Sequence, residues 1–135
     1  NCMAINIHWD NNYDNLIYLT FPEQWSWNDF YEVIHYFHVM TSSQDVDIIV
    51  DMSRSQTLPP NVLTQAQVVL QTATDNIGIV IVIGINPLIR ATFNMFKRIY
   101  KNVIDRHISE FHLVSIQQQA YQLLQGKRHK TNEFV

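Results

Sequence analysis

The hydrophobic pattern of this chain centres on one unbroken apolar segment. Residues 77–85 read Ile-Gly-Ile-Val-Ile-Val-Ile-Gly-Ile, with no polar side chain among them. A run of β-branched residues without polar alternation is typical of a strand that is covered on both faces. Asn86 and Pro87 follow directly, and they fit the N-cap and the first turn of a helix. The pattern therefore predicts a central sheet strand that leads into a helix, with further helices packed on the sheet.

The first part of the chain predicts a hairpin and a helix. Polar and apolar residues alternate over 3–9, and a dense turn signal at 10–15 precedes a second apolar segment at 16–21. This arrangement is typical of an antiparallel β-hairpin. The helix predicted over 26–43 opens with Ser-Trp-Asn-Asp, a variant of the capping box. Its predicted inward face consists of Phe30, Val33, Ile34, Phe37 and Met40.

The rest of the chain alternates between predicted strands and helices. Strands are predicted over 46–52 and 111–114, and helices over 59–74, 87–102 and 115–126. The first of these helices begins at two prolines, and the last ends at Gly126, a typical C′ residue. The predicted inward residues of the helices 59–74 and 87–102 are Leu63, Ala66, Leu70, Ala73, Ala91, Met95, Phe96 and Ile99.

The resulting order, ββαβαβαβα, predicts a single α/β domain. A hairpin followed by βαβ units with right-handed crossovers gives a mixed sheet with a parallel portion and helices packed against it. We assign residues 1–126 to this domain and the polar residues 127–135 to a flexible C-terminal tail.

Composition narrows the classes of function. The 135 residues are 47% hydrophobic, which is enough for one domain with a sizeable core. A net charge of −3 gives no attraction to nucleic acid or anionic membranes, and the segment 77–85 is shorter than the ~20 residues that span a bilayer. Cys2 is the single cysteine, which excludes a disulfide framework within the chain and favours the cytoplasm. Because only 16% of the residues are charged, copies repel one another weakly, and a homo-oligomer is a further hypothesis.

A family resemblance rests on three segments. They are Ile48-Ile49-Val50-Asp51-Met52-Ser53, Leu58-Pro59-Pro60 and the strand at 79–84. In this order they resemble the STAS domain, a family that includes bacterial anti-anti-sigma factors and the cytoplasmic regulatory domains of sulfate transporters. The resemblance spans about residues 5–124. It implies a cytoplasmic bacterial regulatory module, without enzymatic activity or cofactor, that binds an anti-sigma-type or other signalling protein.

The resemblance also implies where such a partner binds. In the family, the loop after the third strand and the helix that follows contact the partner, which corresponds to residues 53–71 here. The expected contact residues are Ser53, Arg54, Ser55, Thr57, Asn61, Thr64, Gln67 and Gln71. Uncharged polar groups of this kind form hydrogen bonds without the desolvation cost of charges. Regulated members carry a phosphorylatable serine next to a glycine in this loop, whereas the loop here is longer and has no glycine.

Asp51 supports an alternative interpretation of the same loop. In receiver domains an aspartate at a strand end accepts a phosphoryl group, but that chemistry needs further acidic, hydroxyl and lysine residues after other strands. Those residues do not occur at the expected places here, so bracing of the loop by hydrogen bonds is the simpler role. The loop 51–60 nevertheless lies where open sheets bind ligands. The alternative function is therefore a small enzyme or an anion- or nucleotide-binding protein that uses this loop.

Three further clusters each have a structural and a functional interpretation. His35 and His38 lie one turn apart, but without a third ligand at a suitable spacing no metal site is predicted. Trp25, Trp27 and Tyr31 form either an exposed apolar patch or part of the core. A basic ridge either meets an acidic partner or is a solvated helix face. The ridge consists of Arg90, Asn94, Lys97 and Lys101, together with Lys127, Arg128 and Lys130.

Overall fold

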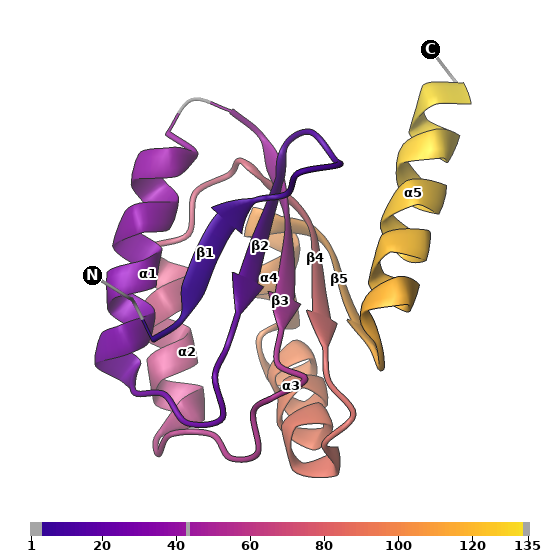
Figure 1. The fold of residues 1–135 in the computed structure, drawn as a ribbon. Helices are drawn as coiled ribbons and strands as arrows, with labels where there is room; N and C mark the ends of the chain where they lie inside the picture. Colours follow the sequence, from indigo (N-terminus) through magenta and orange to yellow (C-terminus); the bar gives the residue numbers. More distant parts are fainter. Residues whose placement is uncertain (1–3, 43, 134–135) are drawn as a thin grey trace.

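The computed structural model of this chain describes residues 4–42 and 44–133, and Figure 1 shows its fold. The strands in this part of the chain are β1 (Asn6–Trp9), β2 (Leu16–Thr20), β3 (Val46–Asp51), β4 (Ile77–Ile83) and β5 (Ile108–Val114). The helices are α1 (Trp27–Met40), α2 (Val62–Gln71), α3 (Pro87–Ile99), α4 (Lys101–His107) and α5 (Gln117–Glu133). The predicted order of elements is confirmed with one addition, because Tyr100 interrupts the predicted helix 87–102 and separates α3 from α4.

The strands form one mixed sheet in the order β1-β2-β3-β4-β5. β1 pairs antiparallel with β2, and each later pair is parallel. Every crossover moves one strand further in the same direction, so right-handed connections place α1 to α4 on one face of the sheet. α5 follows the last strand and packs on the opposite face, where Figure 1 shows it apart from the other helices. The predicted α/β class with a mixed sheet is therefore confirmed.

Two hydrophobic cores lie on the two faces of the sheet. Alternate residues of β2 show the division, because Ile17 and Leu19 join the core under α1 to α4, whereas Leu16 and Tyr18 join the core under α5. β4 contributes to both cores, and its residues 80–83 are all buried. The prediction of a strand covered on both faces is confirmed.

α1 begins as its capping box predicts. Ser26 Oγ accepts a hydrogen bond from the Asp29 N–H (3.2 Å), and Asp29 Oδ2 accepts one from the Ser26 N–H (2.8 Å). Val33 and Phe37 of the predicted inward face are buried, and the other members of that face are half-buried. The predicted end of the helix at Ser43 lies outside the described residues.

α2 is shorter than the predicted helix 59–74. Pro59 and Pro60 stay in the preceding loop, and Asn61 adopts a left-handed conformation (φ 62°) before the helix begins. The Asn61 side chain makes no capping hydrogen bond. Of the ten residues of α2, all of them described, Leu70 alone is buried. α2 is therefore seated on the sheet with less buried surface than the predicted pattern implies.

The face of α3 that packs on the sheet differs from the prediction. Ala91, Met95 and Ile99 are exposed, although helical spacing allows them on the inside. Phe96 packs inward as predicted, together with Ile89, Phe93 and Tyr100, which were not predicted there. Both sets satisfy a spacing of three or four residues, and the set with more aromatic rings buries more apolar area.

α5 continues through Gly126 to Glu133, so the predicted helix end at Gly126 is wrong and residues 127–133 belong to the helix. Glycine ends a helix by adopting a positive φ, and Gly126 does not. Beyond it, Arg128 donates to Asp47 Oδ2 from Nε (3.0 Å) and Nη2 (2.8 Å). This pair fastens the second half of α5 to β3. Residues 134–135 of the predicted tail lie outside the described part of the chain.

Candidate functional site

The loop after β3 begins at Asp51, whose two carboxylate oxygens both accept hydrogen bonds. Oδ1 accepts from the N–H (3.0 Å) and the hydroxyl (2.7 Å) of Ser53. Oδ2 accepts from the Tyr18 hydroxyl at 2.5 Å. Asp51 therefore braces the start of the loop, which is the structural role predicted for it.

Tyr18 connects this loop to α5. Burial raises the pKa of the Tyr18 phenol well above its usual value, and the hydrogen bond to Asp51 raises it further. The phenol therefore keeps its proton, and its oxygen accepts a hydrogen bond from Gln117 Nε2 (2.9 Å). The first turn of α5 is thus tied through Tyr18 to the base of the predicted contact loop.

The predicted contact residues of the loop differ in their exposure to solvent. Ser53, Arg54 and Thr57 are exposed. Ser55 is 3% exposed, and its hydroxyl donates to the carbonyl of Pro22 (2.8 Å). Ser55 therefore anchors the loop from inside, and we correct its place in the predicted contact surface.

The two serine hydroxyls of the same loop are engaged within the chain. The Ser55 hydroxyl points to Pro22, and the Ser53 hydroxyl points to the Asp51 carboxylate. Asn86 Nδ2 donates to the carbonyl of Gln56 (3.1 Å) and holds the middle of the loop. The loop is therefore held in place by contacts within the chain, and Arg54 stays exposed on it.

The exposed side of α2 carries the remaining predicted contact residues. They are Asn61, Thr64, Gln67 and Gln71. Val68 lies among them with 41% of its surface exposed. Residues 55–74 contain no charged side chain, so this surface is polar and uncharged.

Aromatic side chains support α2 from its neighbours. Among the described residues, three hydrogen bonds from aromatic side chains join α2, or Pro60 two residues before it, to other elements. They run from Trp27 Nε1 to the Pro60 carbonyl (2.7 Å), from the Tyr31 hydroxyl to Gln65 Oε1, and from the Tyr100 hydroxyl to the Leu63 carbonyl (3.3 Å). Gln65, predicted on the outer face of this helix, therefore turns toward α1.

The aromatic cluster at the start of α1 is part of the packing. Trp25 lies edge-on to Phe21, with ring centroids 4.9 Å apart, and edge-on to Trp27 at 5.1 Å. Trp27 and Tyr31 hold α2 through the hydrogen bonds above. The structural interpretation of this cluster is therefore confirmed.

Beneath α2 lies an apolar cavity of about 230 Å³. Its walls come from the strands β2 to β5, from α1 and α2, and from side chains of α3. Ala66 of α2 and Ala73, which follows the helix, lie at its roof opposite larger residues of the sheet. Sequence reasoning placed both alanines on the inward side but did not find the cavity, because two inward alanines are equally compatible with close packing.

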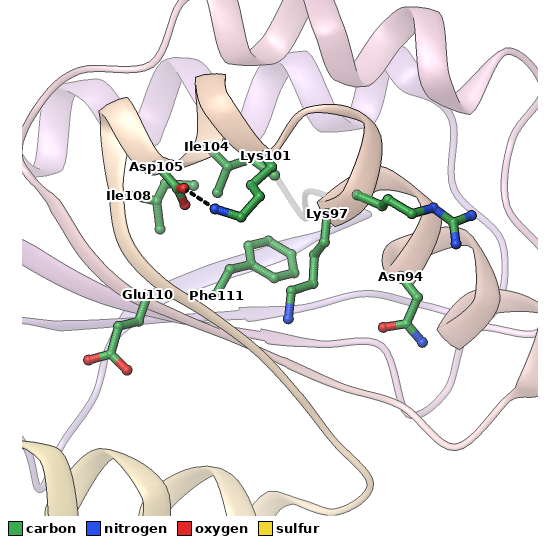
Figure 2. Close-up of a pocket in the computed structure, with 9 residues that line it drawn as sticks. Asn94, Lys97, Lys101, Ile104, Asp105, Ile108, Glu110 and Phe111 are labelled. Carbon is green, nitrogen blue, oxygen red and sulfur yellow. Dashed lines mark hydrogen bonds and ion pairs between the residues drawn. The ribbon is translucent and has the colours of Figure 1, made fainter.

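A second hollow is an open cleft of about 330 Å³ over α3, α4 and β5. Figure 2 shows Phe111 in its centre with Lys97 extending beside the ring, and Lys97 Nζ lies 5.7 Å from the ring centroid. The dashed line in Figure 2 marks the ion pair between Lys101 and Asp105 (2.9 Å). The cleft therefore presents an aromatic floor whose face Lys97 already covers.

The predicted basic ridge is divided among partners within the chain. Arg90 donates to the Gly84 carbonyl (2.9 Å), Lys101 pairs with Asp105, Lys127 pairs with Glu110 (3.1 Å) and Arg128 pairs with Asp47. Hydrogen bonds from His112 and then Lys127 lower the pKa of the Glu110 carboxyl. Asn94 is exposed, and the Lys130 side chain lies outside the described part. The contacts of Lys127 and Arg128 therefore fasten α5 to β5 and β3, whereas Lys101 pairs within α4 and Arg90 with the residue after β4.

The histidines do not form a metal centre. Within residues 4–42 and 44–129, no group of three or more His, Cys, Asp or Glu side chains is arranged to hold an ion. His35 is exposed, while His38 lines the cavity beneath α2. Cys2 lies outside the described residues.

No protein-family model, curated protein or solved structure matches this chain. In the part of the chain that the structure describes, no helix is both long and apolar enough to cross a membrane.

Proposed function

We propose that this protein is a regulatory interaction module of the STAS type, which binds a partner protein through the loop after β3 and the exposed side of α2. Anti-sigma-type and other signalling proteins are the partners that the resemblance suggests. One observation carries the proposal: residues 55–74 have no charged side chain, and yet α2 exposes much of its surface. Charged residues are depleted in the buried centre of protein interfaces.

The chemistry of this surface supports association with a protein. Gln67, Gln71 and Thr64 surround the exposed Val68. Amides and hydroxyls can exchange hydrogen bonds with water for hydrogen bonds with a partner at lower desolvation cost than charges. An apolar side chain among them adds buried area on association.

The loop beside α2 is held in one conformation before a partner arrives. Asp51, Ser55 and Gln56 each have a hydrogen-bonded partner elsewhere in the loop or in other elements. Preorganisation of this kind reduces the entropy lost on binding. Ser53, Arg54 and Thr57 are therefore presented from a fixed loop, next to the uncharged face of α2.

The experiment compares two pairs of charge substitutions. Gln67→Glu with Gln71→Glu introduces two charges on α2, and Gln122→Glu with Gln125→Glu introduces two on exposed positions of α5. We expect both double variants to unfold at nearly the wild-type temperature. Capture of partners from native lysate, and self-association in sedimentation, should weaken at least tenfold for the α2 variant alone.

Equal capture and equal self-association by the two folded variants would exclude this surface as the binding site. Loss in both variants to the same degree would indicate a general effect of net charge and would also contradict the proposal.

A further inference from the structure

The apolar cavity beneath α2 extends over much of the sheet. Along the sheet its lining reaches from Ile77 to Val82 of β4, which are about 17 Å apart on an extended strand. Along the helix layer it reaches from Val62 to Ala73, the full length of α2. Across the sheet the lining runs from Leu19 of β2 to Phe111 of β5, so a volume of about 230 Å³ is spread thinly between the sheet and the helices. A flexible unbranched chain can follow such a space better than a rigid ring system.

The cavity is larger than the voids of a closely packed core. Native interiors contain few voids larger than a water molecule. An apolar cavity of roughly 150 Å³ stays free of water and binds benzene, and this cavity is about half as large again. Because the alanines at its roof leave opposing side chains without partners, an apolar ligand would restore their dispersion contacts.

A second observation marks one end of the cavity. Trp25 lines it, and the Trp25 Nε1 donor is buried without a hydrogen-bond acceptor among the described residues. Buried donors are nearly always paired, so an unpaired one calls for a missing partner. A hydroxyl or carboxylate oxygen at the end of a bound chain would supply the acceptor.

We propose that this cavity binds a single unbranched alkyl chain, such as that of a medium-length fatty acid, with the oxygen head group beside Trp25. The cavity is partly open to solvent, so the alkyl chain can enter beside α2, which buries one side chain and is held by hydrogen bonds from three aromatic side chains. This inference does not rest on the proposed protein partner, because it concerns the interior surface of α2 and is tested on the isolated protein.

The first experiment measures binding of hexanoate, octanoate, decanoate and dodecanoate to the full chain by titration calorimetry. Burial of each methylene contributes roughly 0.8 kcal/mol, which corresponds to about a fourfold tighter dissociation constant. We expect affinity to rise by up to this factor per methylene and then level off when the cavity is full. An affinity that does not depend on chain length, or no binding by any of the four, would overturn the proposal.

The second experiment fills the cavity. Ala66→Phe places a ring in it, and Ala91→Phe places the same ring on the exposed side of α3 as a control. Decanoate affinity should fall at least tenfold in Ala66→Phe and stay unchanged in the control, while the unfolding temperature of Ala66→Phe is equal or higher. If Ala66→Phe does not fold, Ala73→Leu tests the far end and should move the plateau to shorter chains. Wild-type binding by a folded filling variant would contradict the assigned location.

The third experiment tests the head group. Trp25→Phe keeps an aromatic ring and removes the N–H donor. Loss of one hydrogen bond weakens binding by about fivefold to tenfold, so decanoate should bind that much more weakly to Trp25→Phe. Octane, which has no oxygen, should bind both proteins equally. An equal loss for octane would show that Trp25 acts by packing alone and would overturn the placement of the head group.

Discussion

Gly78→Ala is the substitution whose effect the structure defines most sharply. Gly78 lies in β4 beside Asp47 of β3, and a Cβ atom at position 78 would meet Asp47 Oδ1 well inside van der Waals contact. The backbone conformation of Gly78 is not left-handed, so alanine would meet no conformational strain there. The substitution therefore acts through the Asp47 carboxylate.

Asp47 has two structural roles that this displacement would end. Oδ1 accepts a hydrogen bond from the N–H of Ile79 (2.8 Å), and Oδ2 accepts two from Arg128 (3.0 and 2.8 Å). An unpaired, partly buried N–H costs about 1–3 kcal/mol. The ion pair adds about 1 kcal/mol, since the Asp47 and Arg128 side chains are 16% and 30% exposed and water screens them in part. We expect Gly78→Ala to lower the free energy of unfolding by roughly 2–4 kcal/mol, a large share of a typical 5–15 kcal/mol.

The assay is urea unfolding of Gly78→Ala in two backgrounds, wild type and Asp47→Ala. With Asp47 removed, the new methyl group has no carboxylate to displace, so Gly78→Ala should be neutral or stabilise by about 0.4–1 kcal/mol. Gly126→Ala in α5 is the matched control, because a Cβ there has no neighbour within 4 Å. It should stabilise by up to about 1 kcal/mol. An equal cost of Gly78→Ala in both backgrounds would refute the proposed role of Asp47.

Two further predictions concern stability. The raised pKa of Tyr18 means that the folded protein keeps a proton that the unfolded chain loses near pH 10, so stability is complete below that pH and falls above it. Alkaline unfolding curves should show a loss of at most ~1.4 kcal/mol per pH unit from this residue, and Tyr18→Phe should remove that part of the slope. Ser26→Ala removes the N-cap of α1 and should lower the free energy of unfolding in urea by about 1 kcal/mol. An unchanged free energy of unfolding would show that the Asp29 side chain alone caps the helix.

The parts of the fold that the sequence predicted are those in which local signals agree with tertiary packing. The apolar run of β4 needs cover on both faces, and the structure provides it from both cores. The capping box at Ser26 is a purely local hydrogen-bonding motif, and it forms as predicted. The order of elements then follows from the alternation of segments with the apolar spacing of strands and of helices, and their arrangement follows from the handedness of crossovers.

The predictions fail where the local sequence is compatible with more than one structure and contacts with residues distant in sequence determine which one forms. Helix α3 satisfies the helical period with two different faces, and the face with Ile89 and Phe93 packs inside instead of the face with Ala91 and Met95. Gly126 could end α5, but the contact of Arg128 with Asp47, far away in sequence, makes continuation of the helix favourable. Ser55 is polar in a polar loop, and only the position of the Pro22 carbonyl turns it inward.

In the candidate site, too, one feature could be predicted from the local sequence and another could not. Exposure of Thr64, Gln67 and Gln71 could be predicted from the helical period alone. The cavity could not, because its existence depends on how far α2 stands from the sheet. That distance is set by rings on α1 and after α3 that hold α2 from its ends and side, and no pattern within 62–71 encodes it.

The two faces of the sheet hold the proposed contact surface in different ways, and this has a thermodynamic consequence. On the α5 side, Tyr18 and Gln117 fix Asp51 through hydrogen bonds, so the base of the loop is rigid. On the other side, α2 rests above an apolar cavity. If an alkyl chain occupies the cavity as proposed, it would change the position or mobility of α2, and a partner bound to α2 would experience that change. If an alkyl chain in the cavity changes the affinity for the partner protein by some factor, the bound partner must change the affinity for the alkyl chain by the same factor. Binding at the surface and binding in the cavity would then be thermodynamically coupled, because both ligands would affect the position of α2.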